Sequence, residues 1–94
     1  MNEIDESYEF ILVPDSKFET PKFTLILKEI VEKWLPPDRR PMMRITFNFE
    51  TEDNSETLQL TSDEKKIQYK NFIISYLEGW RKDAKFKVDI VKIS

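Results

Sequence analysis

The chain contains no cysteine, no histidine and a single glycine among its 94 residues. Without cysteine there is no disulfide framework and no thiolate metal site. Without histidine the chain lacks the commonest general base, the commonest metal ligand and the usual pH switch. A single glycine cannot supply a phosphate-binding loop, which needs close approach of the backbone. We therefore expect a protein that is not an enzyme and that holds no metal and no cofactor.

Long apolar runs are also missing, and no segment approaches the length of a membrane span. The acidic start, Met1–Glu6, is unlike a signal peptide. The net charge is −3 with both signs interspersed, whereas a non-specific nucleic-acid binder needs a basic face. The length suits one domain over residues 1–94, with 1–7 as an acidic and flexible arm. These features predict a cytoplasmic protein with no membrane contact, for which nucleic acid is not the expected partner.

Two segments repeat one apolar pattern. The first contains Phe23, Ile26, Leu27, Ile30, Val31 and Trp34, and the second contains Tyr69, Phe72, Ile73, Tyr76, Leu77 and Trp80. Steps of three and four residues draw one stripe along an α-helix. Thr20 and Thr61 stand where helix N-caps are expected, the latter in a capping box with Glu64. The pattern predicts helices over 20–35 and from 61 to about 78–82, with a tryptophan closing each end of the core.

Four other segments are predicted as strands: Tyr8–Val13, Met42–Thr51, Glu56–Leu60 and Lys85–Ile93. The second alternates apolar and polar residues, and the short turn at 52–55 makes it an antiparallel hairpin with the third. The resulting order, βαββαβ, resembles the ferredoxin-like superfold. That resemblance implies an α+β two-layer sandwich, with an antiparallel four-stranded sheet of order 4-1-3-2 and two helices on one face. It is topological only, and it implies no particular function.

The sheet face turned away from the helices is the first candidate site. Strand 8–13 is apolar on both sides, so either side can serve as the interior. If Tyr8, Phe10 and Leu12 face the helices, an exposed apolar patch typical of interfaces forms from Ile11, Val13, Val91 and Ile93. The alternative is a mild bulge, or a central strand with ordinary exposed aliphatic residues.

Charged residues near the ends of the sheet are the second candidate. Arg39 and Arg40 could grip a phosphate or carboxylate, or they could simply solubilise a loop flanked by prolines. The turn with Glu52 and Asp53 could bind a cation or a basic partner. Alternatively it is a solvated hairpin balanced by Arg81, Lys82 and Lys85. Arg44, on the polar side of its strand, completes the set of predicted charged contacts.

These features favour a non-enzymatic protein-interaction module. It would be a small acidic regulator, adaptor or inhibitor of a larger complex, of a kind that viruses and plasmids also encode. We expect a protein partner of unknown identity, or a homodimer formed through the open sheet face or a sheet edge. The alternative is binding of single-stranded RNA on the open face in the manner of an RRM domain, which has the same topology. Against that alternative, Thr57–Thr61 offers neither an aromatic residue nor a glycine.

Overall fold

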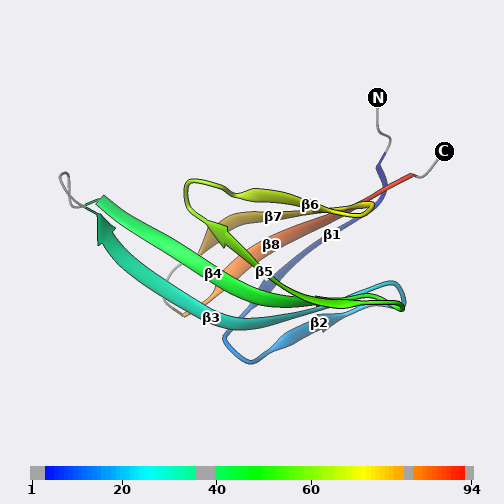
Figure 1. The fold of residues 1–94 in the computed structure, drawn as a ribbon, viewed down its shortest axis with the longest axis horizontal. Helices are drawn as coiled ribbons and strands as arrows, with labels where there is room; N and C mark the ends of the chain where they lie inside the picture. Colours follow the sequence, from blue (N-terminus) through cyan, green and yellow to red (C-terminus); the bar gives the residue numbers. More distant parts are fainter. Residues whose placement is uncertain (1–3, 36–39, 80–81, 93–94) are drawn as a thin grey trace.

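The structure is a computed structural model that describes residues 4–35, 40–79 and 82–92. These residues form eight β-strands and no helix (Figure 1). The strands are β1 (Ile4–Leu12), β2 (Lys17–Glu19), β3 (Thr24–Leu35), β4 (Arg40–Glu50), β5 (Ser55–Thr61), β6 (Lys66–Tyr69), β7 (Phe72–Gly79) and β8 (Ala84–Val91). The predicted α+β ferredoxin-like fold is therefore wrong, because both predicted helices are replaced by strands.

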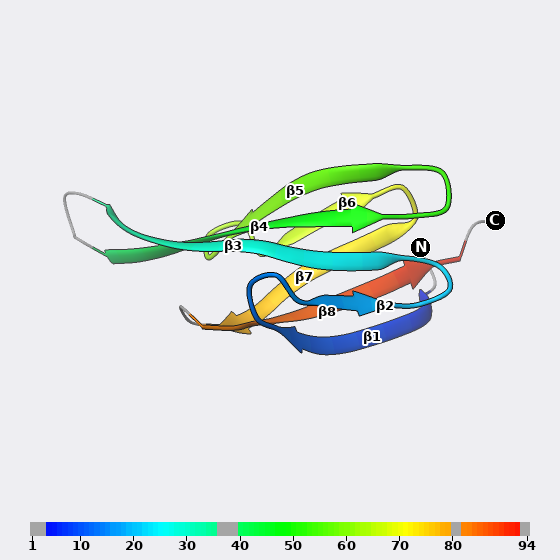
Figure 2. The same ribbon diagram turned by 90° about the horizontal axis from the view of Figure 1, so that it is seen from below.

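Two antiparallel sheets pack face to face, one of order β1-β8-β7-β6 and the other of order β2-β3-β4-β5 (Figures 1 and 2). Strands that follow one another in the chain are neighbours within each sheet, and β1 returns beside β8. The predicted strand order 4-1-3-2 is wrong. Two of its pairings nevertheless occur, because β1 pairs with β8 and β4 forms a hairpin with β5.

The first predicted helix is wrong because a β-bulge imitates helical spacing. Phe23, Leu25 and Leu27 are buried, as expected for alternation along a strand. The ladder with β4 then slips between Leu27 and Glu29, and Ile30 is the next residue to pack on the core. The extra residue of a bulge shifts the following inward-facing side chains by one position. Two successive inward-facing residues are then three apart in the sequence instead of two.

The second predicted helix fails for a similar reason. Tyr69 and Phe72 are three residues apart because they pair across the tight turn between β6 and β7, where Lys70 has a φ of 55°. Along β7, Phe72, Ile74 and Tyr76 are buried in strand alternation, and the ladder with β8 slips just after Tyr76. A turn and a bulge together therefore give steps of three and four residues without any helix.

Both predicted helix caps make hydrogen bonds, but they close turns. Thr20 Oγ1 accepts from the backbone N–H groups of Lys22 at 3.2 Å and Phe23 at 3.1 Å. Thr61 Oγ1 accepts in the same way from Asp63 at 3.2 Å and Glu64 at 2.9 Å. Threonine satisfies the N–H groups of a turn by the same geometry that caps a helix. The motif therefore locates a turn and does not determine which element follows.

Aromatic side chains fill the space between the sheets. All seven phenylalanines and all three tyrosines take part: six are buried in the core cluster, and Tyr8, Phe10, Phe18 and Tyr69 are partly buried against it. Phe23 is at its centre, with its ring centroid 5.3 to 6.1 Å from those of Tyr8, Phe18, Phe49 and Phe72. These rings come from both sheets, so Phe23 joins the two layers. The side chains of Trp34 and Trp80, which were predicted to close the core, lie outside the described residues.

The interior side of β1 is settled by the same packing. Tyr8, Phe10 and Leu12 face the other sheet, whereas Ile11 and Val13 are 62% and 50% exposed. Of the two facings that the sequence allowed, the structure has the one that turns Ile11 and Val13 outward.

Replacing Phe23 by alanine should lower the free energy of unfolding by about 3–5 kcal/mol, because the loss removes ring contacts to both sheets and leaves a cavity. Urea unfolding followed by circular dichroism measures the loss. Ile11→Ala is the control and should change the free energy by no more than about 0.5 kcal/mol, since its side chain is exposed. Equal losses in the two variants would contradict the packing described here.

Candidate functional site

The hairpin of β3 and β4 extends beyond the other strands (Figure 1). β2 pairs with β3 only over Thr24–Ile26, and β5 pairs with β4 only over Arg44–Glu50. Past these limits β3 and β4 have only each other as strand partners within the described part of the chain. We call residues 28–35 of β3 and the β4 residues alongside them, 40–46, the projecting ribbon; residues 44–46, at its root, still pair with β5. Its base is held by the backbone N–H of Ser62, which donates to the carbonyl of Met43 at 3.0 Å.

One edge of the ribbon has no neighbouring strand. Leu27 still exchanges hydrogen bonds with the connection between β1 and β2: its N–H donates to Ser16 at 3.0 Å and its carbonyl accepts from Asp15 at 2.7 Å. Beyond it, Lys28–Val31 has no strand on this side among the described residues. We call this stretch the open edge. An edge of this kind can accept an additional strand from another chain.

The outer face of the ribbon carries an apolar residue beside a cation. Ile30 and Ile45 pair with each other and face the core, so the next pair, Val31 and Arg44, faces outward. Both of these side chains are half-buried. Lys28 and Glu29, at the start of the open edge, are exposed.

One donor of the Arg44 guanidinium is unsatisfied within the described residues. Its Nε atom is buried and has no hydrogen-bond partner among the described residues. A buried donor without a partner costs about 1–3 kcal/mol. Arginine is also among the residue types enriched in binding hot spots. The Nε donor of Arg44 therefore has a cost for the stability of the fold.

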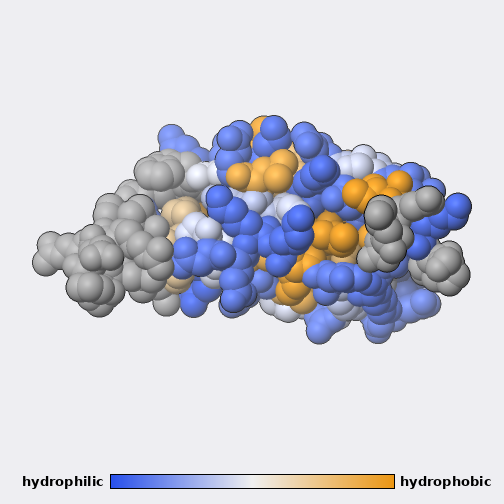
Figure 3. Space-filling model, turned by 90° about the horizontal axis from the view of Figure 1, so that it is seen from above, coloured by the Kyte–Doolittle hydropathy of each residue, from blue (hydrophilic) through white to orange (hydrophobic). Residues whose placement is uncertain are grey.

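The patch predicted from Ile11, Val13, Val91 and Ile93 is not present as one surface. Val91 is buried, with only 6% exposure, and the turn residue Asn71 bonds to its backbone at 2.7 and 3.4 Å. Ile11 pairs with Lys85, which lies six residues along β8 from Val91, or about 20 Å at the rise of a strand. Ile93 lies outside the described residues. Figure 3 agrees, since apolar groups on the face it shows are separated by polar ones.

The predicted charged residues are scattered. Arg39 lies outside the described residues, as does the side chain of Arg40 at the start of β4. Glu52 and Asp53 lie in the turn between β4 and β5, near Lys22 and Lys70. The expected balance by Lys82 and Lys85 is wrong, because these lysines lie at the other end of β8, where Lys85 Nζ is 4.0 Å from Glu9 Oε2. Arg81 lies outside the described residues.

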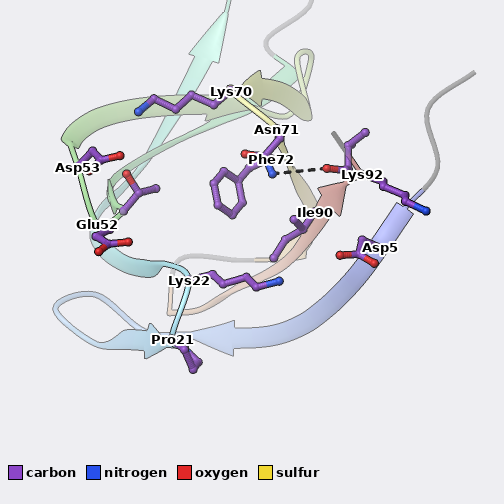
Figure 4. Close-up of a pocket in the computed structure, with 12 residues that line it drawn as sticks. Asp5, Pro21, Lys22, Glu52, Asp53, Lys70, Asn71, Phe72, Ile90 and Lys92 are labelled. Carbon is purple, nitrogen blue, oxygen red and sulfur yellow. Dashed lines mark hydrogen bonds between the residues drawn. The ribbon is translucent and has the colours of Figure 1, made fainter. Parts of the chain in front are cut away.

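A cavity of about 480 Å³ lies among the turns at this end of the sandwich (Figure 4). Phe72 points into it, and Ile90 and Val91 line it beside Phe72. Its rim carries both signs of charge, from Asp5, Lys22, Glu52, Asp53, Lys70 and Lys92. A hydrogen bond to Glu6 at 2.6 Å already engages Lys22 and raises the pKa of that lysine. A mixed rim of this kind does not select one class of ligand by charge.

Among the described residues, no group of three or more acidic side chains is placed to hold a metal ion. The same residues include no helix of the length and apolarity needed to cross a membrane. Compared with known protein families, with curated proteins and with solved structures, the chain matches none of them. A functional argument therefore depends on the geometry of the chain itself, and the projecting ribbon is its most distinctive feature.

Sequence reasoning missed the open edge because it assigned residues 20–35 to a helix. One signal was available. Lys28-Glu29 and Glu32-Lys33 flank the β-branched pair Ile30-Val31, and β-branched residues favour strands. Charged residues on both sides of such a pair are typical of an edge strand protected from aggregation.

Replacing Arg44 by methionine should leave the free energy of unfolding unchanged or raise it by about 1–3 kcal/mol, because the buried Nε donor is removed. Urea unfolding tests this expectation.

Lys87→Met is the matched control, and it should be destabilising. The Lys87 ammonium lies 3.9 Å from the buried carboxylate of Asp89, whose other partner among the described residues is the Ser7 hydroxyl, at 2.6 Å. A loss of stability in Arg44→Met as large as that in Lys87→Met would contradict our account of Arg44.

Proposed function

We propose that this chain is a non-enzymatic protein-interaction module and that the projecting ribbon is its contact surface. The observation that carries the proposal is the open edge, Lys28–Val31, on a hairpin that extends past the rest of the sandwich. A partner strand added there gains backbone hydrogen bonds, and side chains on alternate positions give specificity. In biological terms, this describes a small regulator, adaptor or inhibitor of a larger complex.

The outer face of the ribbon supports the same proposal. Val31 supplies apolar area, and Arg44 beside it supplies a positive charge on the same half-buried outer surface. Arginine is enriched in binding hot spots, so this pair suits contact with an acceptor group of a partner. The exposed charges of Lys28 and Glu29 disfavour indiscriminate pairing of the open edge. A cytoplasmic location belongs to the proposal, since a chain without cysteine suits a reducing compartment.

We do not propose the RNA-binding alternative. It depended on the ferredoxin-like topology, which is wrong, and on aromatic side chains presented on an open sheet face. Every phenylalanine and tyrosine of the chain packs in the core instead. Stacking of bases on a sheet face requires such rings on the surface.

The test compares proteins captured from a native lysate by the tagged chain and by two variants. Val31→Asp places a charge on the outer face of the ribbon and should reduce specific capture at least tenfold. Ile11→Asp is the matched control on the surface first predicted as an interface, and it should capture as well as the wild type. Quantitative mass spectrometry of the captured proteins provides the measurement.

Both aspartate variants must unfold at wild-type urea concentrations for the comparison to hold. Loss of capture with Ile11→Asp and not with Val31→Asp would move the interface to β1 and overturn the proposal. Equal capture by all three proteins would also overturn it.

A further inference from the structure

We propose that the open edge pairs with the same edge of a second copy of this chain, forming an antiparallel two-fold dimer with one continuous eight-stranded sheet. This inference rests on the proposed function, because it uses the projecting ribbon and names its partner. The sheet β2-β3-β4-β5 places the ribbon so that β3 has no neighbour past Leu27 on this side, within the described residues. Two copies can therefore approach there without displacing any strand that the structure shows beside β3.

Symmetry restricts the possible alignments. In a dimer whose two-fold axis is perpendicular to the sheet, each residue of one β3 faces the same side as its copy. Side chains alternate along a strand, so facing residues must be an even number of positions apart or be the same residue. The centre of the pairing must therefore fall on a residue and not between two residues.

The charged residues of β3 then favour one position for the centre of the pairing. A centre on Glu29 or Glu32 would place two glutamates opposite each other, which is destabilising. A centre on Val31 places Glu29 of each copy opposite position 33 of the other, which is a lysine. A centre on Ile30 also gives opposite charges, but it requires Lys28, where the ladder is interrupted by the bulge.

Pairing centred on Val31 begins just past the bulge and uses only regular strand. Glu29 pairs regularly with Thr46 of β4, and the ladder continues without a further slip as far as Leu35. The two Val31 side chains would meet on the outer face, each beside Arg44 of its own chain. The ladder is short and Glu29 is exposed, so the dimer should be weak and should dissociate as salt is added.

The experiment measures mass by sedimentation equilibrium over a concentration series at low and high salt. The single variants Glu29→Lys and Lys33→Glu each place like charges opposite each other twice in the dimer, and each should weaken dimerisation about tenfold. The double variant, Glu29→Lys with Lys33→Glu, restores both pairs with reversed sign and should recover the wild-type dimer. Glu52→Lys and Lys82→Glu, at exposed loop positions away from the ribbon, are matched charge controls that should dimerise normally.

Three outcomes would overturn the inference: a wild-type monomer at every concentration, a dimer insensitive to both single variants, or a double variant that fails to recover. Failure of this dimer can be distinguished from failure of the proposed function. A monomeric wild type whose capture of other proteins depends on Val31 would remove self-pairing and retain the interaction module. Since all the reversed positions lie on a strand edge or exposed loops, urea unfolding of each variant should match the wild type and exclude loss of folding as a cause.

Discussion

The packing of aromatic rings between two sheets is the interaction on which the rest of the structure depends. Phe47 of β4 meets Phe86 of β8 at a centroid distance of 5.6 Å, and Phe23 links further rings of both layers. Phe10 and Phe18 stack at 4.1 Å where β1 passes β2 without a hydrogen-bonded ladder between them. Large rings bury much apolar area in a small domain. The chain spends all its phenylalanines and tyrosines in this way.

This use of the rings constrains what the surface can do. The exposed apolar side chains of the described residues are aliphatic, such as Ile4, Ile11 and Val13. Every phenylalanine and tyrosine is buried or half-buried, so none presents a fully exposed ring to a partner. Backbone pairing at a strand edge requires no aromatic residue, and the projecting ribbon offers it.

Much of the strand content could be predicted from the sequence, and the reason is local. Apolar and polar residues alternate along Met42–Thr51, and Pro14 and the turn at 52–55 follow the ends of strands. The four segments predicted as strands therefore overlap β1, β4, β5 and β8. The helices were wrong because bulges after Leu27 and Tyr76 depend on pairing with β4 and β8. A single sequence window contains the extra residue of a bulge but not the partner strand that defines it. The threonine motifs had the same limit, since their hydrogen bonds are correct and only the following element differs.

The candidate site was harder to predict, because an open edge is a property of what lies beside a strand. Ile11 and Val13 were correctly placed outside in one of the two facings considered. Val91, however, is buried and bonded to Asn71, which lies in a turn that was expected to be part of a helix. Arg44 was named for its charge, and no sequence pattern indicated that its Nε would be buried without an acceptor. Val31 and Glu29 were overlooked as surface residues once their segment was assigned to a helix.

The pairing of β1 with β8 has a mechanical consequence. Ile4 is opposite Val91 at the end of the ladder from which both chain ends leave, so the two ends emerge side by side (Figure 1). Tension applied through these ends would open the ladder from that pair, breaking its hydrogen bonds one after another instead of all at once. The molecule should therefore yield to small pulling forces by peeling β1 away. If a neighbouring domain or surface pulled on both ends, β1 would be the first element released, and the backbone of β8 would then be exposed along its whole length.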